Sequence, residues 1–185
     1  MRSIVRMTLA ALSGAALAAG SMTLQNKAVV EAPRPFEPSG FTFEVEIEVP
    51  GTPGAVFDAF TGDVLPWWDH HVSLEPEAMF IEPRPGGSFM ELFDERGNGI
   101  QHARVTGCDR GKWLRMVGPL GLAGGGVELE MSFTFVQVAD GTKLKLVVHA
   151  QGNVQPEMAK VVQQVWRHFL IERFQPYATD KLRSR

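Results

Sequence analysis

Five consecutive residues, Trp67-Trp68-Asp69-His70-His71, carry the side chains best suited to metal chemistry in this sequence. Imidazole and carboxylate groups are common ligands of zinc and iron. Neighbouring residues, however, rarely direct their side chains at a single ion, and no HExxH motif, spaced histidine pair or cysteine completes a ligand set. We therefore interpret the run as a polar loop and expect neither a metal nor a cofactor.

A second group, Glu91, His102 and Arg104, lies on neighbouring predicted strands. These residues could transfer a proton or hold a ligand if their side chains point inward. Ala103 and Val105 alternate with His102 and Arg104 along one strand and compete for its inner face. We expect the apolar pair to face inward, so Glu91 and His102 are catalytic candidates of second rank and no catalytic residue is assigned.

The composition is that of one ordinary globular domain. The 185 residues include 18 Lys+Arg and 21 Asp+Glu, with a formal net charge of −3 and 44% hydrophobic residues. A chain of this length buries about two thirds of its unfolded surface around a single core. The slight acidic excess offers no attraction for a phosphate backbone, so we expect no nucleic-acid partner.

The N-terminal residues 1–20 have the pattern of a secretory signal peptide. Arg2 and Arg6 precede an uncharged stretch from Met7 to Ala19, and Ala16-Leu17-Ala18 provides small residues for cleavage. That stretch is about thirteen residues long, shorter than the ~20 that span a bilayer. We expect export to the periplasm or beyond and no permanent membrane span after cleavage, with a retained N-terminal anchor as the alternative. Residues 21–40 are interpreted as a proline-rich linker.

The elements that must position the polar groups are mostly strands. Apolar and polar residues alternate from Phe41 to Val49, which predicts a strand with one buried face. Two short helices are expected next, one beginning at Pro53 and a second turn within residues 63–68. Further strands are predicted at residues 78–82, 88–93, 100–108, 112–118 and 127–135. A hairpin turn at Asp140-Gly141 is expected to lead into a return strand with Leu144, Leu146 and Val148 on one face. The short connections between these strands favour an antiparallel meander.

A long amphipathic helix is predicted from Pro156 to about Ala178, followed by a polar tail at residues 179–185. Its apolar residues recur at steps of three and four and form a wide stripe. Such a helix and a one-sided sheet bury their apolar faces by packing together, so an α+β fold is expected.

Residues 41–178 resemble the START-like (SRPBCC) superfamily, which includes polyketide cyclases, aromatase-like proteins and the birch-pollen-allergen group. Within it, the sequence is most similar to the branch named for the activator of the heat-shock-protein-90 ATPase. The resemblance lies in the segments Gly51–Phe60, Trp67-Trp68, Arg84–Phe89 and Asp109–Leu114 and in the final helix with Trp166. It implies a helix-grip fold, in which a curved antiparallel sheet of about six or seven strands wraps around the long C-terminal helix.

The resemblance also implies a cavity between sheet and helix that takes a small apolar or aromatic molecule. Of the two adjacent tryptophans, we expect one to pack inward and Trp68 to lie near the cavity mouth, with the glycine-rich residues 121–126 as a flexible rim. Methionine and aromatic side chains suit an irregular apolar pocket. The alternative is that the same side chains simply fill the core. The expected cavity residues are Trp68, Phe89, Leu114, Met116, Leu129, Met131, Phe133, Leu146, Val165, Trp166 and Phe169.

Three functions from different classes fit this fold, because one superfold hosts many activities. We favour an exported, noncatalytic carrier or sensor of a small apolar molecule. The first alternative is an enzyme of the cyclase or aromatase kind that uses a polar cavity residue. The second is a protein-interaction module of the ATPase-activator type, which the signal peptide disfavours because export would separate it from a cytosolic chaperone. No apolar stripe stands apart from the expected core, so the oligomeric state is left open.

Overall fold

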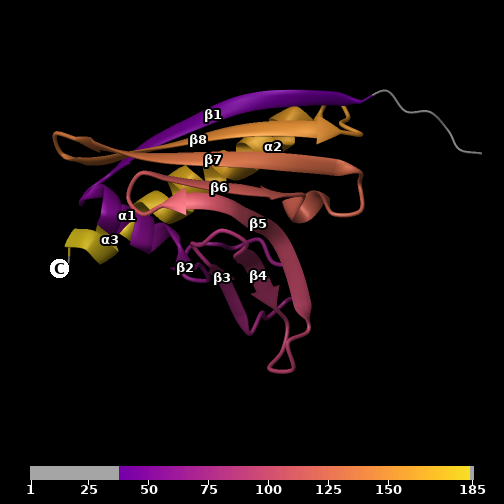
Figure 1. Ribbon diagram of the computed structural model, residues 1–185, viewed down its shortest axis with the longest axis horizontal. Coiled ribbons are helices and arrows are strands. Elements are labelled where there is room, and N and C mark those ends of the chain that lie inside the picture. Colours follow the sequence, from indigo (N-terminus) through magenta and orange to yellow (C-terminus); the bar gives the residue numbers. More distant parts are fainter. Residues whose placement is uncertain (1–37, 184–185) are drawn as a thin grey trace, which may run out of the picture. The chain divides into compact units, whose positions relative to one another are not determined.

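The computed structural model describes residues 38–183, which form an antiparallel sheet of eight strands and a long C-terminal helical segment (Figure 1). The signal peptide expected at residues 1–20 lies outside the described residues, as does nearly all of the linker expected at residues 21–40. The α+β helix-grip fold expected from the sequence is confirmed. The elements below are those of the described part of the chain.

The sheet is a meander to which the first strand is added at one edge. Its order is β1-β8-β7-β6-β5-β4-β3-β2, and all neighbours are antiparallel. About six or seven strands were expected, and the described residues form eight. The two-residue strand β2, which was not predicted, also joins the sheet. The strands are β1 (Ser39–Val49), β2 (Gly62–Asp63), β3 (Ala78–Ile81), β4 (Ser88–Leu92), β5 (Gly99–Asp109), β6 (Trp113–Gly118), β7 (Val127–Val138) and β8 (Gly141–Gly152).

Alternation along the longest strands creates one apolar face. On β7, Leu129, Met131 and Phe133 are buried, whereas Glu128 and Glu130, which alternate with them, are exposed. The return strand β8 repeats the pattern and pairs with β7 along its whole length. Because successive side chains of a strand point to opposite faces, the buried apolar residues of these strands share the face that the helices cover.

One short helix follows β1. In α1 (Pro53–Phe60), the Thr52 hydroxyl accepts a hydrogen bond from the Ala55 backbone N–H, and proline occupies the first helical position. The second short helix expected within residues 63–68 is only a turn, in which the Trp67 and Trp68 N–H groups both donate to the Val64 carbonyl. Strand pairing explains the difference, because the chain between α1 and this turn forms β2 beside β3.

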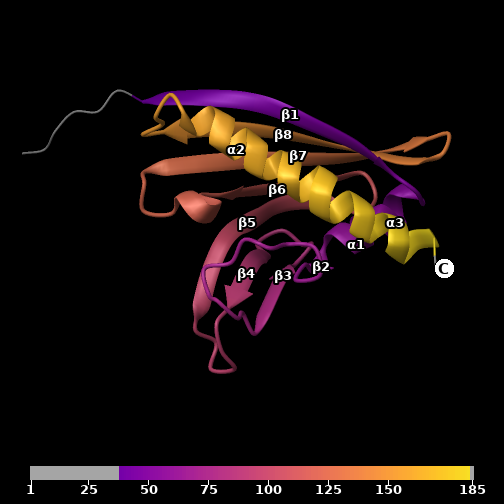
Figure 2. The same ribbon diagram turned by 180° about the vertical axis from the view of Figure 1, so that it is seen from behind.

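The C-terminal segment is helical from Met158 to Arg183 and lies against one face of the sheet (Figure 2). It consists of α2 (Met158–Arg167), the π-helical segment η2 (His168–Phe174) and α3 (Gln175–Arg183). The helix therefore continues beyond residue 178, into residues that the sequence led us to assign to a polar tail. No helix among the described residues is long and apolar enough to cross a bilayer.

The wide turns of η2 end just before a proline. The Gln175 N–H donates to the Leu170 carbonyl, five residues back, instead of the usual four. Pro176 has no N–H and its ring crowds the preceding turn of a regular helix. We attribute the π-helical spacing to this proline, because wider turns accommodate it while the helix continues.

Strand β5 curves strongly where it leaves β6 and joins β4 (Figure 1). Two register shifts mark this bend. Opposite β4, Phe89 pairs with Ala103 and Met90 with Gln101, so His102 is an extra residue on β5. Opposite β6, Val105 pairs with Met116 and Gly107 with Arg115, which leaves out Thr106. Such bulges bend a strand and redirect side chains.

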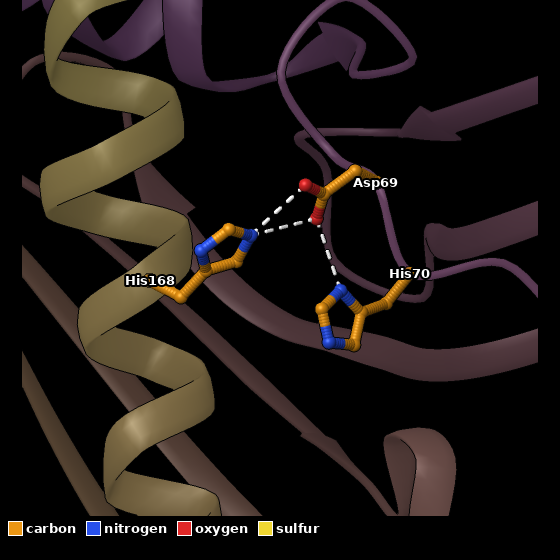
Figure 3. Close-up of side chains that lie close together, drawn as sticks. All are labelled: Asp69, His70 and His168. Atoms are coloured by element: carbon orange, nitrogen blue, oxygen red, sulfur yellow. Dashed lines mark hydrogen bonds and ion pairs between the residues drawn. The ribbon is translucent and has the colours of Figure 1, made fainter.

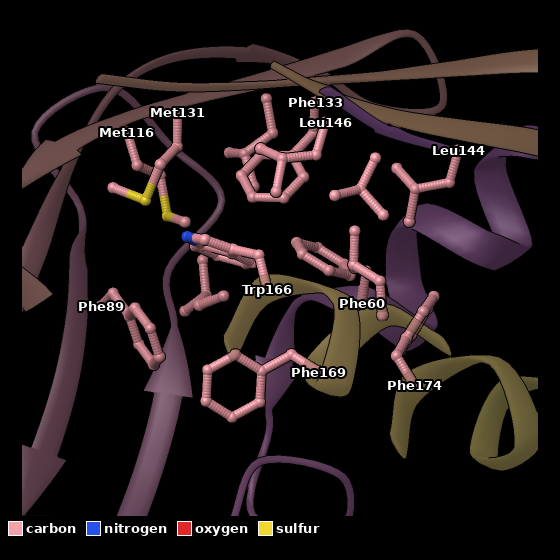
Figure 4. Packing of buried hydrophobic residues seen from close by; sticks show 14 of the residues in the cluster. Phe60, Phe89, Met116, Met131, Phe133, Leu144, Leu146, Trp166, Phe169 and Phe174 are labelled. Atoms are coloured by element: carbon pink, nitrogen blue, oxygen red, sulfur yellow. The ribbon is translucent and has the colours of Figure 1, made fainter. Parts of the chain in front are cut away.

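Aromatic side chains fill the space between the sheet and the helices (Figure 4). Phe60 of α1 lies 4.8 Å from Phe133 of β7 and 5.1 Å from Phe174 of η2, measured between ring centroids. Trp67 stacks on Phe60 at 5.1 Å and is fully buried. This cluster joins three layers of the fold and sets the position of the C-terminal helix relative to the sheet.

Candidate functional site

A cavity of about 410 Å³ opens between the sheet, the helix α2 and the loop that follows Trp68. Its wall is mainly apolar, with histidine as its only titratable residue type. The volume and the small number of polar groups are typical of a site for a small molecule. The lining residues are Trp68, His70, His71, Val72, His102, Leu120, Gly121, Leu122, Leu129, Val161, Val162, Val165, Trp166 and Phe169.

The structure places five of the expected cavity residues on this wall. They are Trp68, Leu129, Val165, Trp166 and Phe169. The two adjacent tryptophans separate as the sequence suggested, with Trp67 in the core and Trp68 on the cavity wall. The short η1 helix (Leu120–Leu122), beside the glycine-rich stretch, adds Leu120, Gly121 and Leu122.

The other six expected residues do not line the cavity. Their side chains are fully buried in the core. Phe133, for example, lies between Phe60 and Trp166 and so has no free side toward the cavity. The six residues are Phe89, Leu114, Met116, Met131, Phe133 and Leu146.

His102 adds a buried polar side chain to the cavity wall, which His70 and His71 also line. The bulge on β5 lets His102 and Ala103, which are consecutive, both be buried, at 4% and 2% exposure. Our expectation that Ala103 and Val105 would displace His102 from the inner face is therefore corrected, because it assumed a regular strand. Arg104 does face solvent.

His102 forms a buried pair with Glu91 of β4. His102 Nε2 lies 2.8 Å from Glu91 Oε2, and neither side chain is more than 5% exposed. The Glu91 carboxylate also accepts hydrogen bonds from the backbone N–H groups of Val72, at 3.0 Å, and Ser73, at 2.7 Å. Burial acts to raise the pKa of Glu91, but the hydrogen bonds from Val72, Ser73 and His102 outweigh it and lower that pKa overall.

The Glu91–His102 pair also fixes the loop at the cavity mouth, residues 69–77, which we call the mouth loop, because Glu91 accepts hydrogen bonds from two of its N–H groups. Because a carboxylate only accepts hydrogen bonds, Nε2 is the ring nitrogen that carries the proton. Within residues 38–183, His102 Nδ1 makes no hydrogen bond. A neutral His102 thus has one acceptor left for a molecule in the cavity, and Glu91 holds both the imidazole and the loop in place.

A second polar cluster lies where this loop meets the helix (Figure 3). His168 Nε2 lies 3.0 and 2.9 Å from the two Asp69 oxygens, and His70 Nδ1 lies 2.9 Å from Asp69 Oδ1. Glu172 Oε2 is 2.9 Å from His168 Nδ1, and Arg173 Nε is 3.2 Å from Asp69 Oδ2. No local sequence pattern predicts this cluster, because Asp69 and His168 are 99 positions apart.

Charges in this cluster stabilise one another. The hydrogen bonds with Glu172 and Asp69 raise the pKa of His168. Burial acts to raise the pKa of Asp69, but its hydrogen bonds with His70 and His168 and the charge of Arg173 lower it overall. The loop is therefore attached to the C-terminal helix by an electrostatic contact that is open to solvent.

Comparison with solved structures supports the fold independently of the sequence reasoning. A protein of unknown function from Staphylococcus aureus superposes with a TM-score of 0.60 at 12% identity, over 80% of this chain and 99% of the other. An AHSA1-like protein from Aeromonas hydrophila gives 0.50 at 14% identity, over 74% and 91%. Ara h 8.0201 gives 0.51 at 16% identity, over 80% and 100%. At these identities the likeness shows the fold alone.

Family membership follows from the sequence itself. The family model described as Activator of Hsp90 ATPase homolog 1-like protein matches residues 50–179, from the end of β1 into α3. Among curated proteins, none matches the sequence. The chain belongs to the Activator of Hsp90 ATPase homolog 1-like family and has the START-like fold of that family.

Proposed function

We propose that this protein is an exported, noncatalytic carrier or sensor that binds a small apolar or aromatic molecule in the cavity beside α2. The observation that carries the proposal is the cavity itself, with its mainly apolar wall and the His102 imidazole held by Glu91. Apolar walls supply affinity through burial, and a few positioned polar groups set orientation.

The polar part of the wall suggests the chemistry of the ligand. With Nε2 donating to Glu91, the neutral tautomer of His102 would offer one acceptor, Nδ1, to a bound molecule. We propose a ligand with a flat apolar body and one donor such as a hydroxyl group. Trp68, Trp166 and Phe169 would contact the flat body, because aromatic rings give large contact areas at little cost in side-chain entropy.

The binding test uses the full mature chain and the apolar fluorescent probe N-phenyl-1-naphthylamine. Val165→Trp fills space at the cavity wall, and we expect it to weaken binding of the probe at least tenfold. Val136→Trp is the matched control, because Val136 is 55% exposed on β7 and lies off the cavity. Equal affinity of the two variants, or no binding by the unmodified protein, would contradict the proposal.

A second candidate function is proton transfer, and the buried Glu91–His102 pair at the cavity favours it. The molecule released on denaturing protein from its native host distinguishes the two. A carrier returns that molecule unchanged after incubation with fresh protein, whereas an enzyme converts it into a product of different mass or structure. Stimulation of Hsp90 ATP hydrolysis by the purified chain would instead support the interaction module.

Export rests on the pattern of residues 1–20 and has its own test. We expect intact-mass spectrometry of protein from the envelope fraction of its native host to give a mature chain beginning near Ala19. A full-length chain that begins at Met1 would contradict cleavage and favour a retained anchor.

A further inference from the structure

The cluster at the junction of the mouth loop and the helix contains three groups of the kinds that bind transition metals. Asp69 and His70 come from the loop, and His168 is the first residue of η2. One ligand atom from each lies within 4.8 Å of the other two. Figure 3 shows the two imidazoles directed at the same carboxylate from opposite elements. The sequence analysis argued against a metal site because neighbouring residues rarely direct their side chains at one ion. In the structure, the neighbours Asp69 and His70 do come together, and His168 joins them.

His168 is flanked by carboxylates on both ring nitrogens. Nδ1 lies 2.9 Å from Glu172, and Nε2 lies 2.9–3.0 Å from both oxygens of Asp69. A neutral imidazole has one N–H, so it can donate at only one of these two places. A cation is needed at the other, and either a proton or a metal ion meets that need.

Glu172 has the position of an outer-shell partner. Metal-binding histidines usually donate the hydrogen of the other ring nitrogen to a carboxylate, which fixes the tautomer and the ring orientation. Here the Nδ1–H of His168 would donate to Glu172, one helical turn away, and leave the Nε2 lone pair toward Asp69 and His70.

We propose that Asp69, His70 and His168 bind a divalent transition metal ion of the zinc class, and that Glu172 is a positioning residue for His168. Nitrogen and oxygen ligands of tetrahedral zinc lie about 3.3 Å apart. Asp69 is 2.9–3.0 Å from each imidazole, but the ligand atoms of His70 and His168 are separated by up to 4.8 Å, so metal binding requires the two rings to move about 1.5 Å closer together. Three protein ligands leave one position for water, and the bound ion would join the loop to the helix.

Arg173 opposes the metal ion. Its guanidinium lies 3.2 Å from Asp69 Oδ2 and adds a positive charge beside the site. Asp69 Oδ1, which His70 approaches, is then the oxygen expected on the metal. We therefore expect Arg173→Gln to bind the ion more tightly than the unmodified protein, a direction that a purely structural cluster would not produce.

The experiment uses the untagged full mature chain after treatment with a chelator. We expect calorimetry with Zn²⁺ to give one ion per chain, and Co²⁺ to give the strong visible absorption of a tetrahedral complex. Glu172→Gln should weaken Zn²⁺ binding about tenfold, the low end of the range for outer-shell partners, because Glu172 is exposed. His70→Gln should weaken it more, while leaving the contact between Asp69 and His168 in place.

His149→Gln is the matched control, because His149 is exposed on β8, between two buried residues, and is not part of the cluster. It should bind Zn²⁺ as the unmodified protein does. A further variant, His168→Gln, should also lose Zn²⁺ binding. Circular dichroism shows whether each variant folds. If His168→Gln does not fold, His70→Gln and Glu172→Gln still test the proposal. Absence of a 1:1 complex, or equal affinities of His70→Gln and His149→Gln, would overturn the proposal. The ligand proposed above plays no part in these measurements, so either proposal can fail alone.

Discussion

The indole of Trp68 lies flat against the phenyl ring of Phe169, with 3.7 Å between ring centroids and 16° between ring planes. Both side chains are buried and both line the cavity. Trp68 precedes the mouth loop and Phe169 belongs to η2, so this stack is the apolar counterpart of the ionic contact between Asp69 and His168. The cavity mouth therefore depends on two kinds of contact between the same two elements.

Replacing Trp68 with alanine should destabilise the fold and open the cavity mouth. We expect a loss of about 3–5 kcal/mol in the free energy of unfolding, the usual cost of truncating a buried aromatic residue. Trp68→Phe keeps a ring on Phe169 and should cost less. Urea denaturation measures both, with Trp113→Ala, at a half-buried position on β6, as the control. Equal losses for Trp68→Ala and Trp113→Ala would show that the stack is unimportant.

Replacing Glu91 with glutamine should loosen the mouth loop. The variant keeps the size of the side chain but loses the negative charge that strengthens the hydrogen bonds from the Val72 and Ser73 N–H groups. Hydrogen bonds to a charged group contribute about 1.5–3 kcal/mol, so hydrogen exchange at these two amides should become roughly ten times faster or more. Glu130→Gln, an exposed carboxylate on β7, should leave their exchange unchanged.

Acid should remove the contribution of Glu91 to stability. The pKa of Glu91 is lowered in the folded protein, so its carboxylate stabilises the fold above the unfolded-state pKa, and this contribution falls as pH decreases through the folded pKa. The stability difference between the unmodified protein and Glu91→Gln should therefore be largest near neutral pH and shrink below about pH 4. Urea denaturation across that range tests this, and a difference independent of pH would contradict it.

Two buried leucines should respond differently to truncation. Leu146 packs in the core on all sides, whereas Leu129 lines the cavity and has fewer neighbours to lose. Within the about 2–5 kcal/mol typical of Leu→Ala, Leu146→Ala should lie near the upper end and Leu129→Ala near the lower. Leu129→Ala should also admit bulkier naphthylamine probes. Equal unfolding free energies and equal probe preferences would argue against the cavity as described.

Regular elements were predictable from the sequence because their residues repeat. Alternation along β1 and β7 and the stripe of the C-terminal helix each place apolar residues on one face, and the structure confirms those faces. The cavity wall was predictable only in part. Trp68 and Phe169 reach it, but Phe133 and Leu146 do not, because alternation shows which face is buried and not how large aromatic neighbours fill it.

The inward position of His102 and the contact between His168 and Asp69 could not be predicted from the sequence, for two different reasons. His102 is inward because of a bulge, which no residue pattern of β5 announces. His168 meets Asp69 through tertiary packing of a helix on a loop, over a separation that no local pattern spans.

The presence of a buried imidazole in the cavity wall depends on one extra residue in β5. His102 faces inward because β5 has one residue more than β4 at this point. Deletion of this single position would restore regular pairing, remove the imidazole and leave Glu91 without that partner. A one-residue deletion at this point would therefore take His102 out of the cavity wall and leave His70 and His71 as its histidines.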